Sequence, residues 1–384
     1  MRRLTLHIGA HKTGTTTLQA TLRHNEALLR TRGMAIAYVP PWPHVHRHLG
    51  FHSLDQFFPH GFSLHDPMAF VDFLANQPAD HVFASSENFS FVFQQKVLDD
   101  LAAALRAKFD HIEILIYLRR QDRQAVSHHQ EGGRPNRRAE AALWGHGLNA
   151  LPDAAQTQRL YLDYDARLML WENAFGRDAL RVRIYDRALL VQGDIVVDAL
   201  KVMAIDHQGL ARLPDQNVTL SYMQAIVGHL ANASLGDDVV TARLLAALPK
   251  GGAKMLPSAQ AAREFLAPYI ASNRRLNARL QISATLDLFC DDFSDYPQSS
   301  PQTPSQEDWA NALRAVIATL GHAAAPHTDL TADDLRKAAV ALEKKDAPTA
   351  LRLISAAHTL RPHGPYINQL KAALEARLRK PNGI

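Results

Sequence analysis

The stretch Leu4–Leu22, LTLHIGAHKTGTTTLQATL, constrains the fold more than any other part of the chain. It opens with a short apolar run, Leu4–Ile8, of the kind that forms a buried strand. Gly9 ends the run, a polar loop follows, and from Leu18 the pattern becomes helical. A strand, a glycine-bounded loop and a helix N-terminus form an anion site, because the free N–H groups of the first helical turn point at whatever the loop holds. The stretch therefore predicts a phosphate site.

The position of the lysine indicates which phosphate chemistry the loop supports. Nucleotide triphosphatase loops read G-x-x-x-x-G-K-[ST], with the lysine directly after the second glycine. Gly9 and Gly14 have this separation, but Thr15 stands at the lysine position and Lys12 lies inside the loop. The loop therefore departs from the triphosphatase pattern at its most informative position.

The end of a second predicted strand, Ile112–Leu118, also departs from that pattern. A triphosphatase places an acidic residue at the end of a neighbouring strand to hold magnesium. Here the strand runs into Arg119. A positive charge at that place suits a second anionic group and not Mg²⁺. We therefore expect no metal in the site.

Two motifs carry a resemblance to a known family. HKTGTTTLQ is similar to the 5′-phosphosulfate loop, K-[ST]-G-T-[ST], of sulfotransferases that use 3′-phosphoadenosine 5′-phosphosulfate (PAPS). YLRRQDRQAVSHHQ resembles their second motif, in which a strand-end arginine and a serine eight residues later bind the 3′-phosphate. The resemblance is closest to bacterial members and extends more loosely to about residue 297.

This resemblance implies a fold, a co-substrate and a set of donor-binding residues. The fold is an α/β architecture of the P-loop type, with a parallel sheet and helices on both of its faces. The co-substrate is PAPS. The residues implied to bind it are His11, Lys12, Thr13, Gly14, Thr15, Thr16, Thr17, Arg119 and Ser127.

Glu87 is the candidate for the base that activates the acceptor. The run His81–Asn88 reads as a strand that ends in polar residues, and ligands of parallel α/β sheets collect beyond the carboxyl ends of the strands. In the sulfotransferases that the chain resembles, a strand between the two nucleotide motifs often delivers this base, as a glutamate or a histidine. The alternative is that Glu87 caps a helix or forms an ion pair. We favour the base, with a histidine of the segment 44–52 or His128 as the next candidates.

The segment 44–52 carries a histidine pattern that can also form a metal site. His44, His46, His48 and His52 include pairs four residues apart, a spacing that can bind zinc on a helix. No nearby cysteine or carboxylate completes a metal set, and Pro43 and Gly50 favour a loop. We therefore interpret the segment as a solvated or substrate-contacting loop.

The regular elements follow from hydrophobic periodicity. We predict a parallel sheet whose strands alternate with helices. Beyond those named above, the predicted elements are helices over 15–30, 89–109 and 161–175 and strands over 34–39 and 180–185, with a helix-rich region over 220–290.

Composition excludes several classes of protein. With 384 residues, 47% apolar and 21% charged, the chain has an ordinary globular composition. A formal charge of +4 is too small to indicate a nucleic-acid partner. The single cysteine, Cys290, fits a reducing compartment. No apolar stretch is long enough for a membrane span or placed like a signal peptide, so we expect a cytoplasmic protein, acting there or at the inner membrane face.

The composition changes near residue 298. Residues 298–306 are rich in proline and serine and read as a linker between a sulfotransferase domain, 1–297, and a helical tail, 307–384. The segment Asp346–Pro362 resembles the second half of a tetratricopeptide repeat. Because a single repeat cannot bury its own apolar face, the tail is expected to pack on the first domain, on a protein partner or on a second copy.

The sequence thus predicts transfer of a sulfuryl group from PAPS to a hydroxyl or amine. The acceptor is expected to be a glycan, a glycolipid or a small metabolite, with Glu87 as base and Lys12 stabilising the leaving phosphate. Two alternatives stay open: a P-loop kinase or other nucleotide-dependent phosphotransferase, and a nucleotide-binding scaffold without catalysis.

Overall fold

The structure is a computed structural model that describes residues 1–51, 61–135, 137, 144–152, 156–213, 220–249, 251, 253–298, 303–323, 331–343 and 346–379. Its internal contacts divide the chain into two compact units, Met1–Ala315 and Val316–Ile384, called here the N-terminal and C-terminal units. They are described separately. The predicted linker, residues 298–306, precedes this division, which falls inside the helix α15 (Gln306–Ala323).

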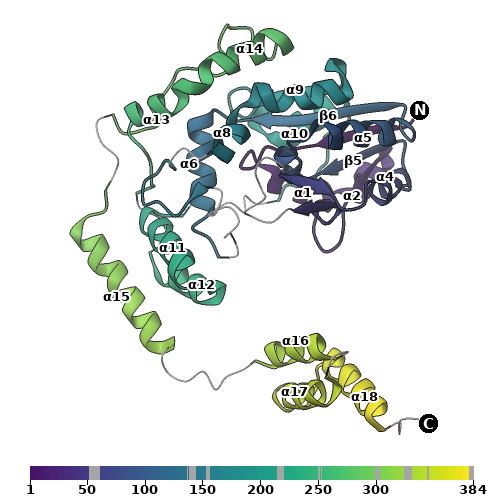
Figure 1. Ribbon diagram of the computed structural model, residues 1–384, viewed down its shortest axis with the longest axis vertical. Helices are drawn as coiled ribbons and strands as arrows, with labels where there is room; N and C mark the ends of the chain where they lie inside the picture. The colour runs from purple at the N-terminus through teal and green to yellow at the C-terminus, as the bar shows by residue number, and fades with distance from the viewer. Residues whose placement is uncertain are drawn as a thin grey trace. The chain divides into compact units, whose positions relative to one another are not determined.

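The N-terminal unit is built on a parallel sheet with helices packed around it (Figure 1). The sheet has five strands in the order β2-β5-β1-β6-β7. The chain places β1 at the centre, where His7 is in register with Ser85 of β5 on one side and with Leu115 of β6 on the other. The five strands are β1 (Arg3–His7), β2 (Met34–Ala37), β5 (His81–Ser85), β6 (His111–Leu118) and β7 (Leu180–Ile184).

The helices and remaining short elements of this unit alternate with the strands. The first half contains α1 (Thr15–His24), α2 (Glu26–Thr31), η1 (His46–His48), β3 (Leu49–Phe51), β4 (Phe62–Leu64), α4 (Pro67–Ala75), η3 (Glu87–Phe91), α5 (Gln95–Arg106) and α6 (Gln121–Glu131). The second half contains α8 (Gln156–Leu162), α9 (Tyr164–Phe175), η4 (Arg177–Ala179), η5 (Val191–Gly193), α10 (Ile195–Val202), α11 (Tyr222–Ser234), α12 (Asp238–Ala247), α13 (Ala259–Leu266), η6 (Ala267–Tyr269) and α14 (Ile270–Leu280).

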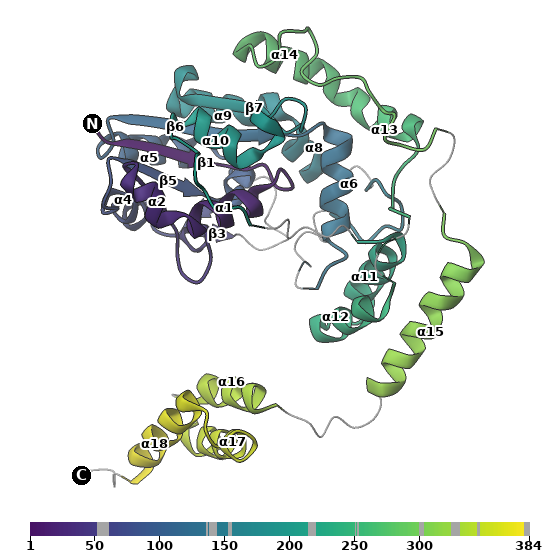
Figure 2. The ribbon, with the colours of Figure 1, turned by 180° about the vertical axis from the view of Figure 1, so that it is seen from behind.

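Helices cover both faces of the sheet, as the resemblance implied. Successive residues of β6 alternate between the two cores: Ile114 and Ile116 face one, and Leu115 and Tyr117 face the other. The first core is closed by α4, α5 and α9, and the second by α1, α2 and α10. Figure 2 shows β7 next to β6 at the edge of the sheet. The predicted α/β fold with a parallel sheet between two helical layers is confirmed.

Two predicted helices are broken where a polar side chain caps a turn. The helix predicted over 15–30 ends at His24, and α2 begins after Asn25. Asn25 donates from Nδ2 to the carbonyl oxygens of Thr21 and Ala211, and it accepts from the N–H of Ala211. The helix predicted over 161–175 is divided at Asp163, whose side chain caps α9. The helix predicted over 89–109 begins only at Gln95, because η3 occupies the preceding turn.

The C-terminal unit contains the helices α16 (Ala332–Leu342), α17 (Ala347–Leu360) and α18 (Pro365–Arg379). Small side chains allow these helices to approach closely: Ala339, Ala350 and Ala357 are fully buried around Ile354. Pro362 follows α17 and stops it. The likeness of this unit to a tetratricopeptide repeat stays a prediction.

Candidate functional site

The loop between β1 and α1 has the backbone geometry of an anion cradle. Gly14 adopts a left-handed conformation (φ 77°) immediately before the first turn of α1, and among the described residues no side chain caps that turn. The first N–H groups of this ten-residue helix are therefore directed into the loop. A side chain at Gly14 would meet Tyr185 Oη at 3.0 Å, so a tyrosine from the end of β7 closes the loop from outside.

Glu87 lies directly against this loop. The backbone of Gly9 has φ 102°, and a Cβ added there would lie 3.2 Å from the Cα of Glu87 and 2.8 Å from Ser90 Oγ. The contact follows from the strand order, because β5 and β1 are paired neighbours and both chains leave the sheet at the same edge. The Cα and Cβ of the residue predicted as base are thus adjacent to the first residue of the phosphate loop.

Three side chains determine the state of the Glu87 carboxylate. Gln19 donates from Nε2 to Glu87 Oε2 at 2.9 Å, and His46 Nε2 lies 3.8 Å from Glu87 Oε1. Burial alone would raise the pKa of Glu87. The adjacent His46 and His11 rings, which favour the charged carboxylate when they are protonated, hold this pKa well below its usual value. The carboxylate is therefore ionised at neutral pH and can accept a proton.

Lys12 is held by an acidic residue from the end of α6. Its Nζ donates to Glu131 Oε2 at 2.9 Å, and the Lys12 side chain remains 24% exposed. Burial would raise the pKa of Glu131, but the charge and the hydrogen bond of Lys12 lower it. Arg134 also contacts Glu131 Oε2, at 3.1 Å. An anion entering the loop would compete with Glu131 for the Lys12 ammonium.

Arg119 lies at the carboxyl end of β6, on the other side of the loop from Glu87. Its Nη1 donates to the carbonyl oxygen of Lys12 at 3.3 Å, and burial lowers its pKa. Arg119 also lines a hollow of about 180 Å³ between the ends of β6 and β7 and the segment 289–290. The other lining residues are Arg120, Arg123, Ile184, Tyr185, Asp186, Ala188, Leu189, Phe289 and Cys290.

Arg120, the second arginine of the strand end, has a different environment from Arg119. It is buried, forms an ion pair with Asp122 at 2.8 Å and stacks on the ring of Phe293. Arg120 therefore fixes the start of α6, whereas Arg123 and Ser127 lie one turn apart on the partly exposed side of that helix. Ser127 does not line the hollow, but Arg123 does.

The other loop residues have unequal access to a ligand. The hydroxyl of Thr13 is buried and donates to the carbonyl oxygen of Ala10 at 2.6 Å. Thr15 is buried, Thr17 is partly buried and Thr16 is exposed. Thr16 and Thr17 thus keep accessible hydroxyls in the first turn of α1, whereas Thr13 stabilises the loop itself.

Four histidines lie around the loop and beside Glu87. The His11 ring stacks on the His128 ring, with centroids 5.0 Å apart, and contacts Tyr161. Burial lowers the pKa of His11 to about 4 and that of His128 well below its usual value, so both rings are neutral at neutral pH. His44 stacks on His46 with centroids 3.6 Å apart, and burial lowers the pKa of His44 to about 4.

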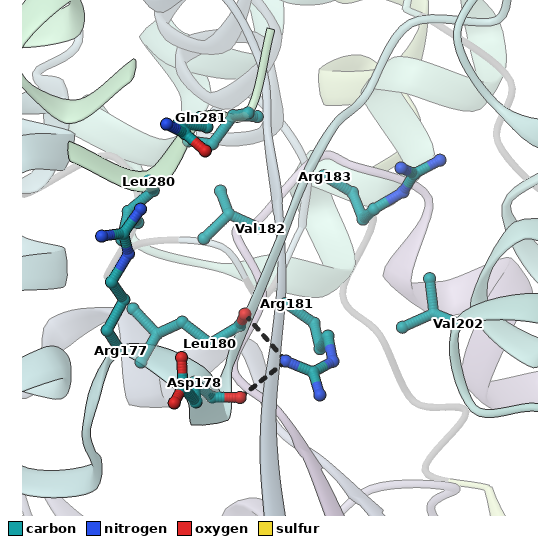
Figure 3. A pocket seen from close by; sticks show the side chains of 10 residues that line it. Arg177, Asp178, Leu180, Arg181, Val182, Arg183, Val202, Leu280 and Gln281 are labelled. Atoms are coloured by element: carbon teal, nitrogen blue, oxygen red, sulfur yellow. Dashed lines mark hydrogen bonds between the residues drawn. The ribbon is translucent and has the colours of Figure 1, made fainter. Parts of the chain in front are cut away.

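A second hollow lies away from this loop. It measures about 680 Å³ and is lined by Arg177, Asp178, residues 180–183 of β7, Val202 and residues 280–282 (Figure 3). Its arginines serve the fold: Arg181 donates to the backbone oxygens of Asp178 and Leu180 and pairs with Glu113. We therefore locate the candidate site at the Gly9–Thr17 loop, where the carboxyl ends of the strands meet.

Two features of the described residues bear on other classes of function. No group of three or more histidine, cysteine, aspartate or glutamate side chains there is arranged to hold a metal ion. His52, one of the four histidines considered for zinc, lies outside the described residues. No helix in the same part of the chain combines the length and apolar character needed to cross a membrane.

Sequence reasoning missed two side chains that now belong to the site, Gln19 and Glu131, whereas His46 lies in the segment 44–52, which it named as another source of the base. Gln19 and His46 contact Glu87, and Glu131 contacts Lys12. Gln19 could have been suspected, because it lies one turn into the helix that follows the loop. The pairing of Glu131 with Lys12 has no local signal, since 119 residues separate the two.

Comparison with known proteins gives limited matches. No model of a known protein family matches the chain. The chain is 33% identical to an uncharacterized protein of Archaeoglobus fulgidus over 76 residues, which are 20% of this chain and 21% of that protein. The chain therefore spans about a fifth of the length of this relative. A sulfotransferase from Alicyclobacillus acidocaldarius aligns in structure over 74% of this chain and 97% of its own, with 15% identity and a TM-score of 0.39.

Proposed function

We propose that this chain is a sulfotransferase that moves a sulfuryl group from PAPS to a hydroxyl or amine of an acceptor. The observation that supports the proposal is the close approach of Glu87 to Gly9, together with the hydrogen bond from Gln19 of α1 to the ionised Glu87 carboxylate, beside a loop that suits a phosphate. A carboxylate beside a phosphate loop suits transfer of a group from the bound donor to a hydroxyl or amine, because the carboxylate can take the proton that the nucleophile loses.

In this proposal the donor lies along the carboxyl edge of the sheet. The Gly9–Thr17 loop holds the 5′-phosphosulfate, with backbone N–H groups that need no reorganisation when charge develops. Lys12 leaves Glu131 and binds the oxygen that bridges sulfur and phosphorus. Arg119, with Ser127 or the neighbouring Arg123, binds the 3′-phosphate near the hollow at the ends of β6 and β7.

The acceptor approaches from the β5 side. Its nucleophilic atom forms a bond to sulfur while the bond from sulfur to the bridging oxygen breaks. The electron pair of that bond remains on the phosphate of the departing adenosine 3′,5′-bisphosphate, and the proton of the acceptor passes to Glu87. We propose a glycan, a glycolipid or a small metabolite as the acceptor, and for the helical tail a contact with a protein or a second copy.

The direct test is transfer of label from [³⁵S]PAPS, with [γ-³²P]ATP as the control donor. Transfer from PAPS alone is expected. Transfer from ATP would support a kinase instead, and nucleotide binding without transfer from either donor would support a scaffold.

Glu87→Gln tests the base within this proposal, because glutamine keeps the shape and cannot accept the proton. We expect turnover to fall by roughly 10²–10⁴, with PAPS affinity within about threefold of wild type. The opposite pattern, preserved turnover with lost PAPS binding, would make Glu87 a structural residue.

A further inference from the structure

Three side chains around Glu87, those of Ser86, His46 and Gln19, fix where hydrogens lie on the β5 side of the loop. Ser86 is fully buried at the end of β5, and its Oγ accepts a hydrogen bond from the N–H of Asn88 at 3.2 Å. The same oxygen lies 2.6 Å from His46 Nδ1. Gln19 occupies the other carboxylate oxygen of Glu87, Oε2, so that Oε1 is the oxygen that faces His46.

These contacts determine which nitrogen of His46 carries a hydrogen. A buried hydroxyl that donates to no acceptor is costly, and His46 Nδ1 is the acceptor that lies against Ser86 Oγ. In neutral His46, Nδ1 therefore accepts from Ser86 and the hydrogen lies on Nε2. In protonated His46, Nδ1 donates to Ser86 and Nε2 again carries a hydrogen. In both states Nε2–H points toward the Glu87 carboxylate.

The gap between these two groups matches one atom of an acceptor. Nε2 and Oε1 are 3.8 Å apart, which is too far for a direct hydrogen bond. A heteroatom about 2.8 Å from each would contact both, at ordinary hydrogen-bond distances. It would then accept from a donor on His46 and donate to Glu87.

A hydroxyl and an amine differ in their ability to fill this gap. A hydroxyl oxygen has two lone pairs, one to attack sulfur and one to accept from His46 Nε2–H, and its proton goes to Glu87. A neutral amine nitrogen has a single lone pair, which attacks sulfur. With an amine, the Nε2–H of His46 would face N–H groups and make no hydrogen bond, at the cost of a lost bond in a half-buried site.

We infer that His46 is a specificity-determining residue that restricts transfer to oxygen, so that the acceptor is an alcohol or sugar hydroxyl and the product a sulfate ester. This inference rests on the proposed function and narrows it, because that proposal leaves hydroxyl and amine open. Glu87 remains the base, and His46 supplies the hydrogen bond that selects the nucleophile.

The test is a competition between two small nucleophiles with the same carbon frame, 2,2,2-trifluoroethanol and 2,2,2-trifluoroethylamine, whose amine is largely unprotonated near neutral pH. The intact chain is given [³⁵S]PAPS and both nucleophiles at equal concentration. Labelled sulfate ester and labelled sulfamate are separated, and the uncatalysed rates are subtracted. The ratio of products is measured within each variant, so it does not depend on the fraction of active protein.

We expect wild type to form the ester in excess. His46→Leu removes the donor and should lower the ester-to-sulfamate ratio by roughly tenfold or more. His46→Gln is the matched control, because its amide N–H can take the position of Nε2–H, and it should retain most of the preference. An ester-to-sulfamate ratio in His46→Leu within about twofold of wild type, or a wild type that prefers the amine, would overturn the role of His46. It would leave the proposed sulfotransferase function in place. Absence of any transfer from PAPS, even to water, would instead overturn the proposed function and this inference with it.

Discussion

Gly9→Ala should damage both the stability and the activity of the chain, and the structure gives the scale of each effect. The alanine would have to adopt φ 102°, a left-handed backbone that costs an L residue about 1–2 kcal/mol. Its Cβ would also lie 2.8 Å from Ser90 Oγ. That oxygen cannot easily move, because Ser90 is buried and donates to the carbonyl oxygen of Ile8 at 2.6 Å.

Relief of this contact requires a shift of the backbone, for which overpacked sites typically lose about 1–3 kcal/mol. The two costs together predict a loss of roughly 2–5 kcal/mol in the free energy of unfolding. The shift would also separate Glu87 from the loop, because the added Cβ lies 3.2 Å from the Cα of Glu87. A displacement of this kind is expected to lower turnover by about a hundredfold.

Gly33→Ala is the matched control. Gly33 also has a positive φ, 78°, but a Cβ there would have no heavy atom within 4 Å. Gly33→Ala should lower the free energy of unfolding only by the cost of the left-handed backbone, about 1–2 kcal/mol, and should keep its turnover. Urea unfolding of both intact variants, followed by circular dichroism, gives the comparison. If Gly9→Ala loses no more stability than Gly33→Ala, the close approach of Glu87 to the loop is wrong.

Three further predictions concern Lys12, Arg119 and two buried histidines. Lys12→Ala should lower turnover with PAPS by roughly a hundredfold or more, and near-wild-type turnover would remove Lys12 from the mechanism. Arg119→Ala should weaken PAPS binding in calorimetry by roughly 2–3 kcal/mol but spare a donor without the 3′-phosphate, and equal losses would contradict the assignment. Burial lowers the pKa of His7 to about 4 and of His129 to about 3, so these folded-state histidines stay neutral while unfolded ones gain protons below about pH 6.5. Each of these histidines should therefore lower the free energy of unfolding of the protein by about 1.4 kcal/mol per pH unit as the pH falls from 6.5 toward 4. A free energy of unfolding that is constant over that range would refute this.

The sheet was predictable because its strands are apolar runs with polar ends. The predicted segments at 4–8, 112–118 and 180–185 each match a strand to within one residue. Local pattern suffices for such elements, since a strand buried between two helical layers must be apolar on both sides. The loop after β1 was predictable for a related reason, because glycines and a lysine between a strand and a helix have few other uses.

The points where predicted helices end early, and the side chains that contact the site residues, were not predictable from local pattern. The helix after the loop ends at Asn25 because the amide of Asn25 pairs with Ala211, which is 186 residues away in the sequence. Lys12 and Glu131 are likewise brought together only by the packed fold. Sequence patterns name the groups that can do chemistry, whereas the partners that set their charge and direction depend on contacts between distant segments.

The strand order itself separates the two halves of the proposed reaction. Since β1 lies between β5 and β6, any ligand in the Gly9–Thr17 loop has Glu87 on one side and Arg119 on the other. The β5 side carries Glu87, Gln19 and His46, which suit a nucleophile that loses a proton. The β6 side carries the arginine-lined hollow, which suits an anionic nucleotide. Acceptor and nucleotide would therefore meet only at the loop, and a substitution on one side should change acceptor choice or donor affinity but not both.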